Sequence, residues 1–293
     1  MSVATRDAQE GGSATEGVRS LPWIAGLWFA ALLALCYAPV LAHLVHQWMT
    51  DDDMGHGFFV PVIAGFIAWQ RRDELAAVKP EPSWWGLAVI LWGAAQLYLA
   101  TLGAELFLAR TAFVISLAGV VLFLGGWPVL KILRFPLFLL LFMIPIPAIV
   151  YNQITFPLQM IASRLAEIAL SACGVPVFRD GNILELPNQR LQVVEACSGI
   201  RSLLTLSFLS LVYAYFFDKK TWMRPLLLAL TVPIAIVANA SRVTLSGLLS
   251  GIDPELAEGL YHMVSGWVIF LLALALLIAV HAGINRIYRL AHG

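Results

Sequence analysis

Charged side chains are scarce in this chain of 293 residues. They make up 12% of the sequence, about half of the ~25% usual in soluble domains, whereas hydrophobic residues make up 60%. A soluble fold of this length cannot bury so much apolar surface, so the composition excludes a soluble globule and predicts a protein that uses the lipid bilayer as its solvent. The 18 basic and 18 acidic residues cancel, which excludes a nucleic-acid-binding protein.

Cysteine is also rare, and the three cysteines are too few for a disulfide framework and lack the spacing of zinc ligands. No metal or organic cofactor is therefore expected. Cys36 lies within an apolar stretch and Cys173 at the end of a predicted helix, and both are interpreted as small packing residues. A disulfide between Cys173 and Cys197 stays open as an alternative, because both are expected on the oxidising side of the membrane.

Long apolar stretches dominate the chain after residue 20. Residues 1–20 are polar and small and are expected to form a disordered cytoplasmic tail, followed by one transmembrane domain over 21–293. A span needs about 20 apolar residues, and the candidates are 21–46, 57–70, 84–103, 107–126, 132–150, 198–217, 225–249 and 263–284. The first is too long for a cleaved signal peptide. The pattern predicts an all-α polytopic membrane protein with about eight transmembrane helices.

Basic residues orient these spans, because they gather in every second loop. They follow the second, fourth, sixth and eighth spans: Arg71, Arg72 and Lys79; Lys131 and Arg134; Lys219, Lys220 and Arg224; Arg286 and Arg289. The positive-inside rule therefore places both termini in the cytoplasm. The acidic run 51–53, Glu105 and the loops 151–197 and 250–262 then lie outside.

The outer loop 151–197 is long enough to hold its own structure. Its first half repeats apolar residues every three or four positions, namely Ile154, Leu158, Ile161, Leu165, Ile168 and Ala172. The pattern predicts a helix at the membrane interface, although a helix packed inside the bundle fits equally well. Gly174 is well placed to end it. Turn signals at Asp180-Gly181 and Pro187-Asn188 then predict a small β-meander that leads into Cys197.

Three chemically active residues lie at the same predicted leaflet. Cys197 opens the sixth span, Arg242 lies toward the outer end of the seventh, and His262 enters the eighth. A thiol at a helix N-terminus near a cationic group favours the thiolate, and a neighbouring histidine can carry its proton. Arg242 keeps its charge at any working pH and suits an oxyanion. These are the candidate catalytic residues.

Each candidate also has a simpler interpretation. Cys197 can be an apolar filler, Arg242 can extend to the lipid headgroups, and His262 can be an interfacial residue at a helix start. His56 and Arg201 are weaker candidates for contacts with a substrate. The acidic run 51–53 either senses a substrate or is a solvated loop, and the second interpretation is favoured.

Several segments, in order along the chain, resemble one known family. The segment Glu195-Ala196-Cys197-Ser198-Gly199-Ile200-Arg201-Ser202 resembles the cysteine motif of the exosortases, a family of bacterial membrane enzymes. Further segments resemble the same family over roughly residues 50–285: Asp53–Pro61 with Trp69, Arg71 and Arg72; Gly174–Val177; Arg179–Asn182; Asn239–Arg242; and His262. The match therefore covers nearly all of the predicted membrane domain.

The resemblance implies a membrane-embedded cysteine protease or transpeptidase in the bacterial inner membrane, with its active site on the periplasmic side. Its substrates would be secreted proteins with a PEP-CTERM sorting tail, which Cys197 would attack to form an acyl-thioester. Arg242 and His262 would assist, and water or an envelope-related acceptor would resolve the thioester. The alternatives are a non-enzymatic transporter or assembly factor for exopolysaccharide, and an acyltransferase that uses the same residues on a lipid-linked chain.

Overall fold

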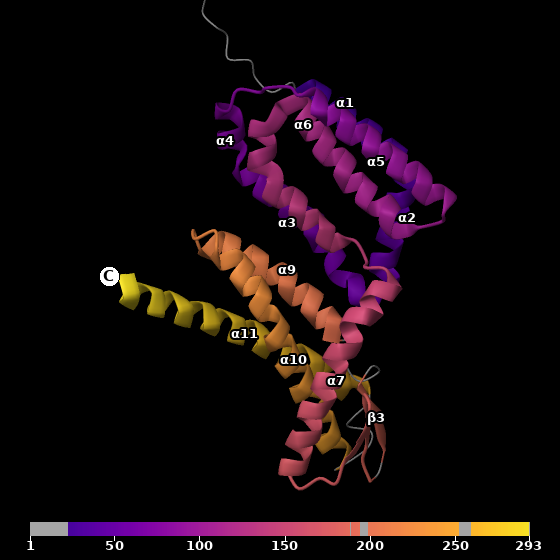
Figure 1. Ribbon diagram of the computed structural model, residues 1–293, viewed down its shortest axis with the longest axis vertical. Coiled ribbons are helices and arrows are strands. Elements are labelled where there is room, and N and C mark those ends of the chain that lie inside the picture. Colours follow the sequence, from indigo (N-terminus) through magenta and orange to yellow (C-terminus); the bar gives the residue numbers. More distant parts are fainter. Residues whose placement is uncertain (1–22, 188, 194–198, 252–258, 293) are drawn as a thin grey trace, which may run out of the picture. The chain divides into compact units, whose positions relative to one another are not determined.

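The protein is helical throughout its membrane region in the computed structural model (Figure 1). The described residues are 23–187, 189–193, 199–251 and 259–292. Among them, four helices are long and apolar enough to cross a membrane, or five if the bent pair α1 and α2 counts as one span. This confirms an all-α polytopic membrane protein, whereas the number eight stays a prediction. The predicted tail 1–20 lies outside the described residues.

The described elements follow one another in a helical order with one short sheet. They are α1 (Trp23–Cys36), α2 (Ala38–Thr50), η1 (Asp52–Phe58), α3 (Phe59–Gln70), α4 (Arg72–Ala77), α5 (Trp84–Leu102), α6 (Leu106–Leu139), η2 (Leu140–Met143), α7 (Ala148–Ala172), β1 (Phe178–Asp180), β2 (Ile183–Glu185), β3 (Arg190–Gln192), α9 (Gly199–Phe217), α10 (Met223–Ser250) and α11 (Gly259–His292). They form two compact units: unit 1 comprises Met1–Pro39 and Ala64–Leu137, and unit 2 comprises Val40–Ile63 and Phe138–Gly293.

The apolar stretch 21–46 is not one straight helix, because α1 and α2 meet at an angle of 71°. Pro39 lies at the start of α2 and has no N–H to continue the hydrogen-bond ladder of α1. Cys36 consequently ends α1 instead of lying in the middle of a span, and it is exposed. The predicted packing role of Cys36 is therefore wrong.

The predicted span 132–150 is wrong as a single helix. Helix α6 ends at Leu139, a short 3₁₀ turn follows, and α7 begins only at Ala148. Two prolines explain the break: Ile144 precedes Pro145 and adopts an extended backbone (φ −96°, ψ 120°), as residues before proline prefer. Hydropathy detects the apolar composition of 132–150 but not this interruption.

Within unit 1, α5 and α6 approach each other through glycines. A Cβ atom at Gly86 would lie 2.2 Å from the backbone N of Phe123, and one at Gly93 would lie 2.2 Å from Ser116 Oγ. Small residues of this kind allow membrane helices to pack closely. At Gly126 the chain has a φ of +75°, and a Cβ would lie 1.8 Å from the carbonyl oxygen of Glu81, so only glycine fits this kink of α6.

The predicted β-meander is present in unit 2 as the antiparallel sheet β1-β2-β3. Asp180 pairs with Ile183 across the two-residue loop Gly181-Asn182. Gly181 has a φ of +63°, as the first loop residue of a type II′ hairpin requires. The side of the membrane on which this sheet lies stays a prediction.

Helix α7 contacts the meander through polar side chains on the face opposite to its apolar residues. Glu167 accepts a 2.7 Å hydrogen bond from Arg179 Nε, Ser163 donates to the carbonyl of Gly181, and Gln159 accepts from Asn182. The opposite stripe of the helix, which includes Ile154, Ile161, Leu165 and Ile168, is exposed. Such an exposed apolar stripe suits contact with lipid.

The end of α7 confirms the predicted role of Gly174. Its φ is +79°, its N–H donates to the carbonyl of Ser171, and the N–H of Val175 donates to the carbonyl of Leu170. These two bonds form a Schellman motif, which glycine favours. Cys173 is the last residue of this cap and is exposed, so its predicted packing role is also wrong.

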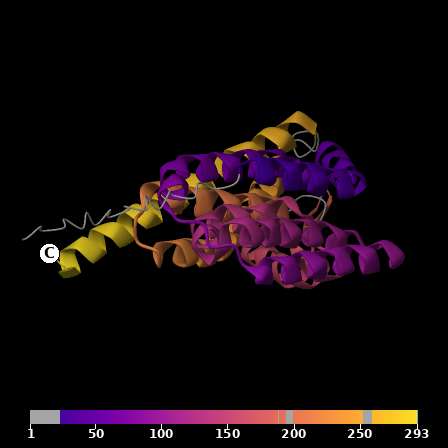
Figure 2. The same cartoon turned by 90° about the horizontal axis from the view of Figure 1, so that it is seen from above.

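Helix α10 is the centre of unit 2, because it packs against α7, α9 and α11. On the α7 side, Ala166 and Leu170 share a buried core with Leu184 and Leu191 of the sheet and with Val243 of α10. On the other side, a second buried core joins the three helices α9, α10 and α11. Helix α11 is a single helix from Gly259 to His292, and Figure 2 shows its C-terminal part in yellow.

Candidate functional site

Arg242 of α10 lies against the backbone of α11 at a glycine. A Cβ atom built at Gly266 would lie 3.1 Å from Arg242 Nη2, 3.2 Å from Cζ and 3.6 Å from Nε. Three atoms of one planar group at similar distances place the guanidinium over the missing side chain of Gly266. The half-buried arginine therefore reaches the neighbouring helix instead of extending away from the protein.

The helix that receives Arg242 also carries His262. His262 belongs to the first turns of α11 and precedes Gly266 by four residues, the spacing that puts two residues on one face of a helix. The structure thus brings Arg242 to the helix of His262, one turn away along the chain. The side chain of His262 lies outside the described residues.

Cys197 also lies outside the described residues, but the chain on both sides of it is described. Before it, Val193 is fully buried in the core that contains Val243, the residue after Arg242. After it, α9 begins at Gly199. The predicted nucleophile is therefore flanked by a segment whose Val193 shares a buried core with Val243, and by a helix N-terminus.

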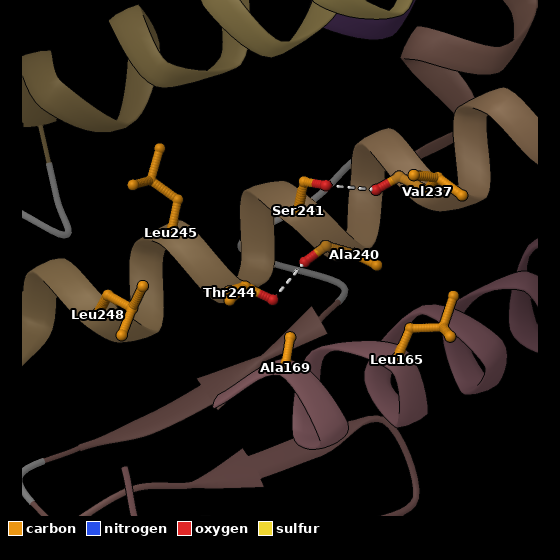
Figure 3. Close-up of a pocket in the computed structure, with 8 residues that line it drawn as sticks. All are labelled: Leu165, Ala169, Val237, Ala240, Ser241, Thr244, Leu245 and Leu248. Atoms are coloured by element: carbon orange, nitrogen blue, oxygen red, sulfur yellow. Dashed lines mark hydrogen bonds between the residues drawn. The ribbon is translucent and has the colours of Figure 1, made fainter. Parts of the chain in front are cut away.

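A groove opens between α7 and α10 close to Arg242 (Figure 3). It has a volume of about 420 Å³ and is lined by Leu165, Ala169, Val237, Ala240, Ser241, Thr244, Leu245 and Leu248. Both hydroxyl groups donate to backbone carbonyls of α10, Ser241 to Val237 at 2.8 Å and Thr244 to Ala240 at 2.9 Å. With their protons used in this way, the groove presents an almost entirely apolar wall.

His56 and Gly57 fasten η1 to η2. The Nε2 atom of His56 lies 3.2 Å from the carbonyl oxygen of Phe142, and its ring lies 6.5 Å from that of Phe208 in α9. A Cβ at Gly57 would lie 2.4 Å from Trp48 Nε1, which donates to the carbonyl of Met143. These contacts account for the early histidine-glycine segment through packing, and a substrate contact of His56 stays a prediction.

The remaining predicted residues are less informative. Arg201 belongs to α9, but its side chain lies outside the described residues. Asp51 accepts a hydrogen bond from Gln47 at 3.3 Å, one turn earlier in the chain. Within the described part of the chain, no group of three or more His, Cys, Asp or Glu residues is arranged to hold a metal ion.

The sequence analysis missed a buried polar cluster, named here the Asp218 cluster, which consists of Tyr213, Asp218, Lys220, His281 and Asn285. Asp218 directly follows α9, and its Oδ2 atom lies 2.9 Å from His281 Nε2 and 3.0 Å from Asn285 Nδ2. The signal was available, because His281 interrupts the apolar stretch 263–284 and Asp218 ends the stretch 198–217. A second missed residue is Arg110 of α6, which is buried although it is charged.

The surroundings of Asp218 favour its ionised form. Burial raises the pKa of Asp218, but hydrogen bonds from His281, from the Lys220 N–H and from Asn285, with the charge of Lys220, lower it overall to about 2. Since the ordinary value is 3.8, the folded state is stabilised above about pH 4, and this stabilisation is lost as the pH falls toward 2.

We therefore expect acid to destabilise the protein partly through Asp218. The shift corresponds to about 2 kcal/mol of the free energy of unfolding at neutral pH. Thermal unfolding in detergent, measured between pH 6 and pH 2.5, should give a melting temperature that falls more steeply for the native chain than for Asp218→Asn. Parallel curves for the two proteins would contradict this assignment.

Comparison with known proteins fits a multi-pass membrane protein with a candidate site at α10 and α11. The chain matches the family described as Transmembrane exosortase over residues 48–279, which is more than half of its length. The protein therefore belongs to the transmembrane exosortase family. Helices α9 and α10 and all three candidate catalytic residues fall within the matched range. No curated protein and no solved structure matches the chain.

Proposed function

We propose that the protein is a membrane cysteine peptidase or transpeptidase that cleaves the PEP-CTERM sorting tail of secreted proteins. The observation that carries the proposal is the contact of Arg242 with α11 at Gly266, one turn beyond His262. It unites two of the three candidate residues in one region of unit 2. All three candidate residues lie within the range 48–279 that matches the family.

Each of the three candidate residues has its own role in the proposed reaction. Cys197 attacks the backbone carbonyl of the tail as a thiolate, so that a C–S bond forms and a tetrahedral oxyanion develops. Arg242 stabilises this oxyanion with a charge that does not titrate. His262 accepts the thiol proton and returns it to the leaving amine when the C–N bond breaks. Water or an acceptor amine then attacks the thioester and releases the sulfur.

The covalent chain supports a short separation between Cys197 and Arg242. Cys197 is four positions after Val193, and a fully extended chain spans at most about 3.6 Å per residue, so the link is at most about 14 Å long. Val193 itself packs in the core of Val243. The proximity of α9 at Gly199 adds the positive end of a helix, which favours a thiolate.

The groove between α7 and α10 is the proposed seat for the membrane-spanning part of the substrate tail. Its small residues Ala169 and Ala240 allow a second helix to approach closely, and its apolar wall suits a lipid-soluble segment. A tail held in this groove lies along α10 between Val237 and Leu248, a stretch that includes Arg242. Confinement in the bilayer also raises the local concentration of the tail.

Filling the groove should impair processing without touching the catalytic residues. We expect Ala169→Phe to reduce the rate of tail cleavage about tenfold, because the ring occupies the space of the substrate helix. Ile168→Phe is the matched control: Ile168 is the neighbouring residue, is 59% exposed and does not line the groove. Equal rates for the two variants, measured with a tailed reporter in cells, would exclude the groove as the seat of the tail.

The proposal includes a location in the bacterial inner membrane, with both termini in the cytoplasm and the active site on the periplasmic side. Basic residues after alternate spans carry this orientation. In cells with a permeabilised outer membrane, a membrane-impermeant maleimide should therefore label Cys197 before the inner membrane is opened.

Covalent capture tests the function itself. A peptide with the sorting motif and a thiol-reactive electrophile at the cleavage site should attach to Cys197, as mass spectrometry of the digested protein would detect. Cys36 and Cys173 are internal controls, because both are free and exposed yet have no role in the proposal. Labelling that is equal at the three cysteines, or equal for a scrambled peptide, would overturn the proposal. A non-enzymatic transporter predicts the latter result.

A further inference from the structure

We infer that the Asp218 cluster is a clamp that fixes the rotation of α9 relative to α11 and thereby positions Cys197 and His262. The inference rests on the proposed function for the roles of these two residues. Asp218 and its partners are positioning residues, since they lie at the ends of α9 and α11 opposite to Cys197 and His262. The clamp itself is defined by geometry within unit 2.

The cluster joins the two helices through several hydrogen bonds. Tyr213 of α9 contributes its hydroxyl group, which lies 2.9 Å from His281 Nδ1 of α11. Asp218 accepts from His281 and Asn285, and its second oxygen accepts from the N–H of Lys220 at 2.8 Å. Asp218 and His281 are only 7% and 5% exposed, so water does not compete freely for these bonds.

The ionised Asp218 determines which of its neighbours must donate to it. A carboxylate only accepts, so His281 must carry a proton on Nε2 and Asn285 must present its NH₂ group. The Tyr213 hydroxyl can both donate and accept, so it pairs with His281 Nδ1 in either protonation form of the ring. The Lys220 ammonium donates to Asn285 Oδ1 and so fixes the orientation of the amide. Each group has a defined role, which makes the cluster directional.

Directional contacts matter here because apolar contacts in lipid are weak determinants of helix rotation. Lipid tails are as apolar as leucine, so the core of α9, α10 and α11 does not by itself exclude rotated or shifted packings. A buried hydrogen-bonded cluster does, because any rotation leaves an ionised carboxylate without its partners. The hydrogen bond between Ser207 and Thr231 fixes α9 to α10 in the same way.

The clamp acts on the candidate site through the helices themselves. Helix α9 starts two residues after Cys197 and ends next to Asp218, whereas α11 carries His262 near its start and His281 in its second half. A rigid helix transmits a rotation at one end to the other. A loosened clamp therefore changes the distance and angle between the groups at the opposite ends.

Spin labels can measure this rotation without any catalytic activity. In the full chain with its three cysteines replaced, labels at Leu203 in α9 and Val264 in α11 report the separation of the two helix starts. We expect Asp218→Asn to broaden the distance distribution about twofold, because one carboxylate oxygen becomes an NH₂ group that cannot accept from the Lys220 N–H or from His281 and Asn285. Tyr37→Phe is the matched control, since it removes a buried hydrogen bond to Ser116 in unit 1.

A catalytic measurement then links the clamp to the site. In the cysteine-containing chain, we expect Asp218→Asn to raise the pH midpoint of Cys197 alkylation by about one unit and to slow tail cleavage about tenfold. Asp218→Glu should recover part of both effects. His281→Gln removes the ring that joins Tyr213 to Asp218, so it should broaden the distribution too, and it serves as a second variant if Asp218→Asn does not fold.

Different results would overturn the clamp and the proposed function. A distance distribution that is unchanged in both Asp218→Asn and His281→Gln would overturn the clamp, whatever the protein does to its substrates. A broadened distribution with an unchanged Cys197 alkylation profile would also overturn it, as the helices would then move without affecting the site. Tail cleavage that continues without Cys197 would instead overturn the proposed function, and the spin-label result would still stand.

Discussion

Replacing Cys197 with alanine is expected to abolish tail cleavage while the protein still inserts into the membrane. The acyl-thioester requires the sulfur, and no other group of the proposed site can form a covalent bond with the substrate. Loss of a nucleophile usually costs at least about 10³-fold in rate, because the remaining groups act only through it. Immunoblots of a tailed reporter protein should show only the uncleaved form.

Two further variants make this result specific. Cys197→Ser should also be inactive or nearly so, because a serine hydroxyl is a much weaker nucleophile without strong base activation. Cys173→Ala should process normally, since Cys173 is an exposed thiol outside the proposed chemistry. Normal cleavage by Cys197→Ala would end the nucleophile assignment.

Hydropathy predicted where the helices are, but not where they are interrupted. The stretches 84–103 and 225–249 agree closely with α5 and α10, because each is a continuous helix of apolar residues. The stretch 132–150 failed at Pro145 and Pro147, which have the same apolar character as their neighbours but end the helix through the backbone. Local backbone chemistry overrode composition there.

The amphipathic pattern of α7 was recognised correctly, but its meaning was incomplete. The sequence separates an apolar stripe from a polar one, and it does not state what covers each stripe. The structure places the meander on the polar face, through Ser163 and Glu167, and leaves the apolar stripe exposed. The contact between Glu167 of α7 and Arg179 of the sheet forms only after the chain turns back at the end of α7, so the local sequence pattern does not predict it.

The candidate site was also predictable only in part, because its contacts join residues that are far apart in the sequence. Charge in an apolar chain identified Arg242 from the sequence alone. Gly266 was not identified, because a glycine becomes informative only when the group above it is known. The partnership of Asp218 with His281 joins residues 63 positions apart, and it depends on how α9 and α11 pack.

Arg242→Lys is expected to reduce tail cleavage about 10²-fold although the positive charge is retained. The guanidinium lies flat over Gly266 and presents a planar set of donors, whereas an ammonium is a compact point charge on a flexible stem. Loss of one oxyanion donor typically costs about 10²–10³-fold in rate. Rates should therefore be measured with a purified tailed substrate in detergent. A near-normal rate would make Arg242 an anchor to the headgroups.

A substitution at Gly266, the glycine beneath Arg242, tests the position of the guanidinium without changing its charge. Gly266→Ala keeps the arginine but places a Cβ 3.1 Å from Nη2 and 3.2 Å from Cζ, so the guanidinium must move by a few tenths of an ångström. We expect about tenfold slower cleavage, because misplaced oxyanion donors lose most of their effect. Gly283→Ala in the same helix is the control, since a Cβ there meets nothing within 4 Å. If Arg242→Lys cleaves slowly and Gly266→Ala cleaves at the normal rate, the planar donors of the guanidinium are required but its contact with Gly266 of α11 is not.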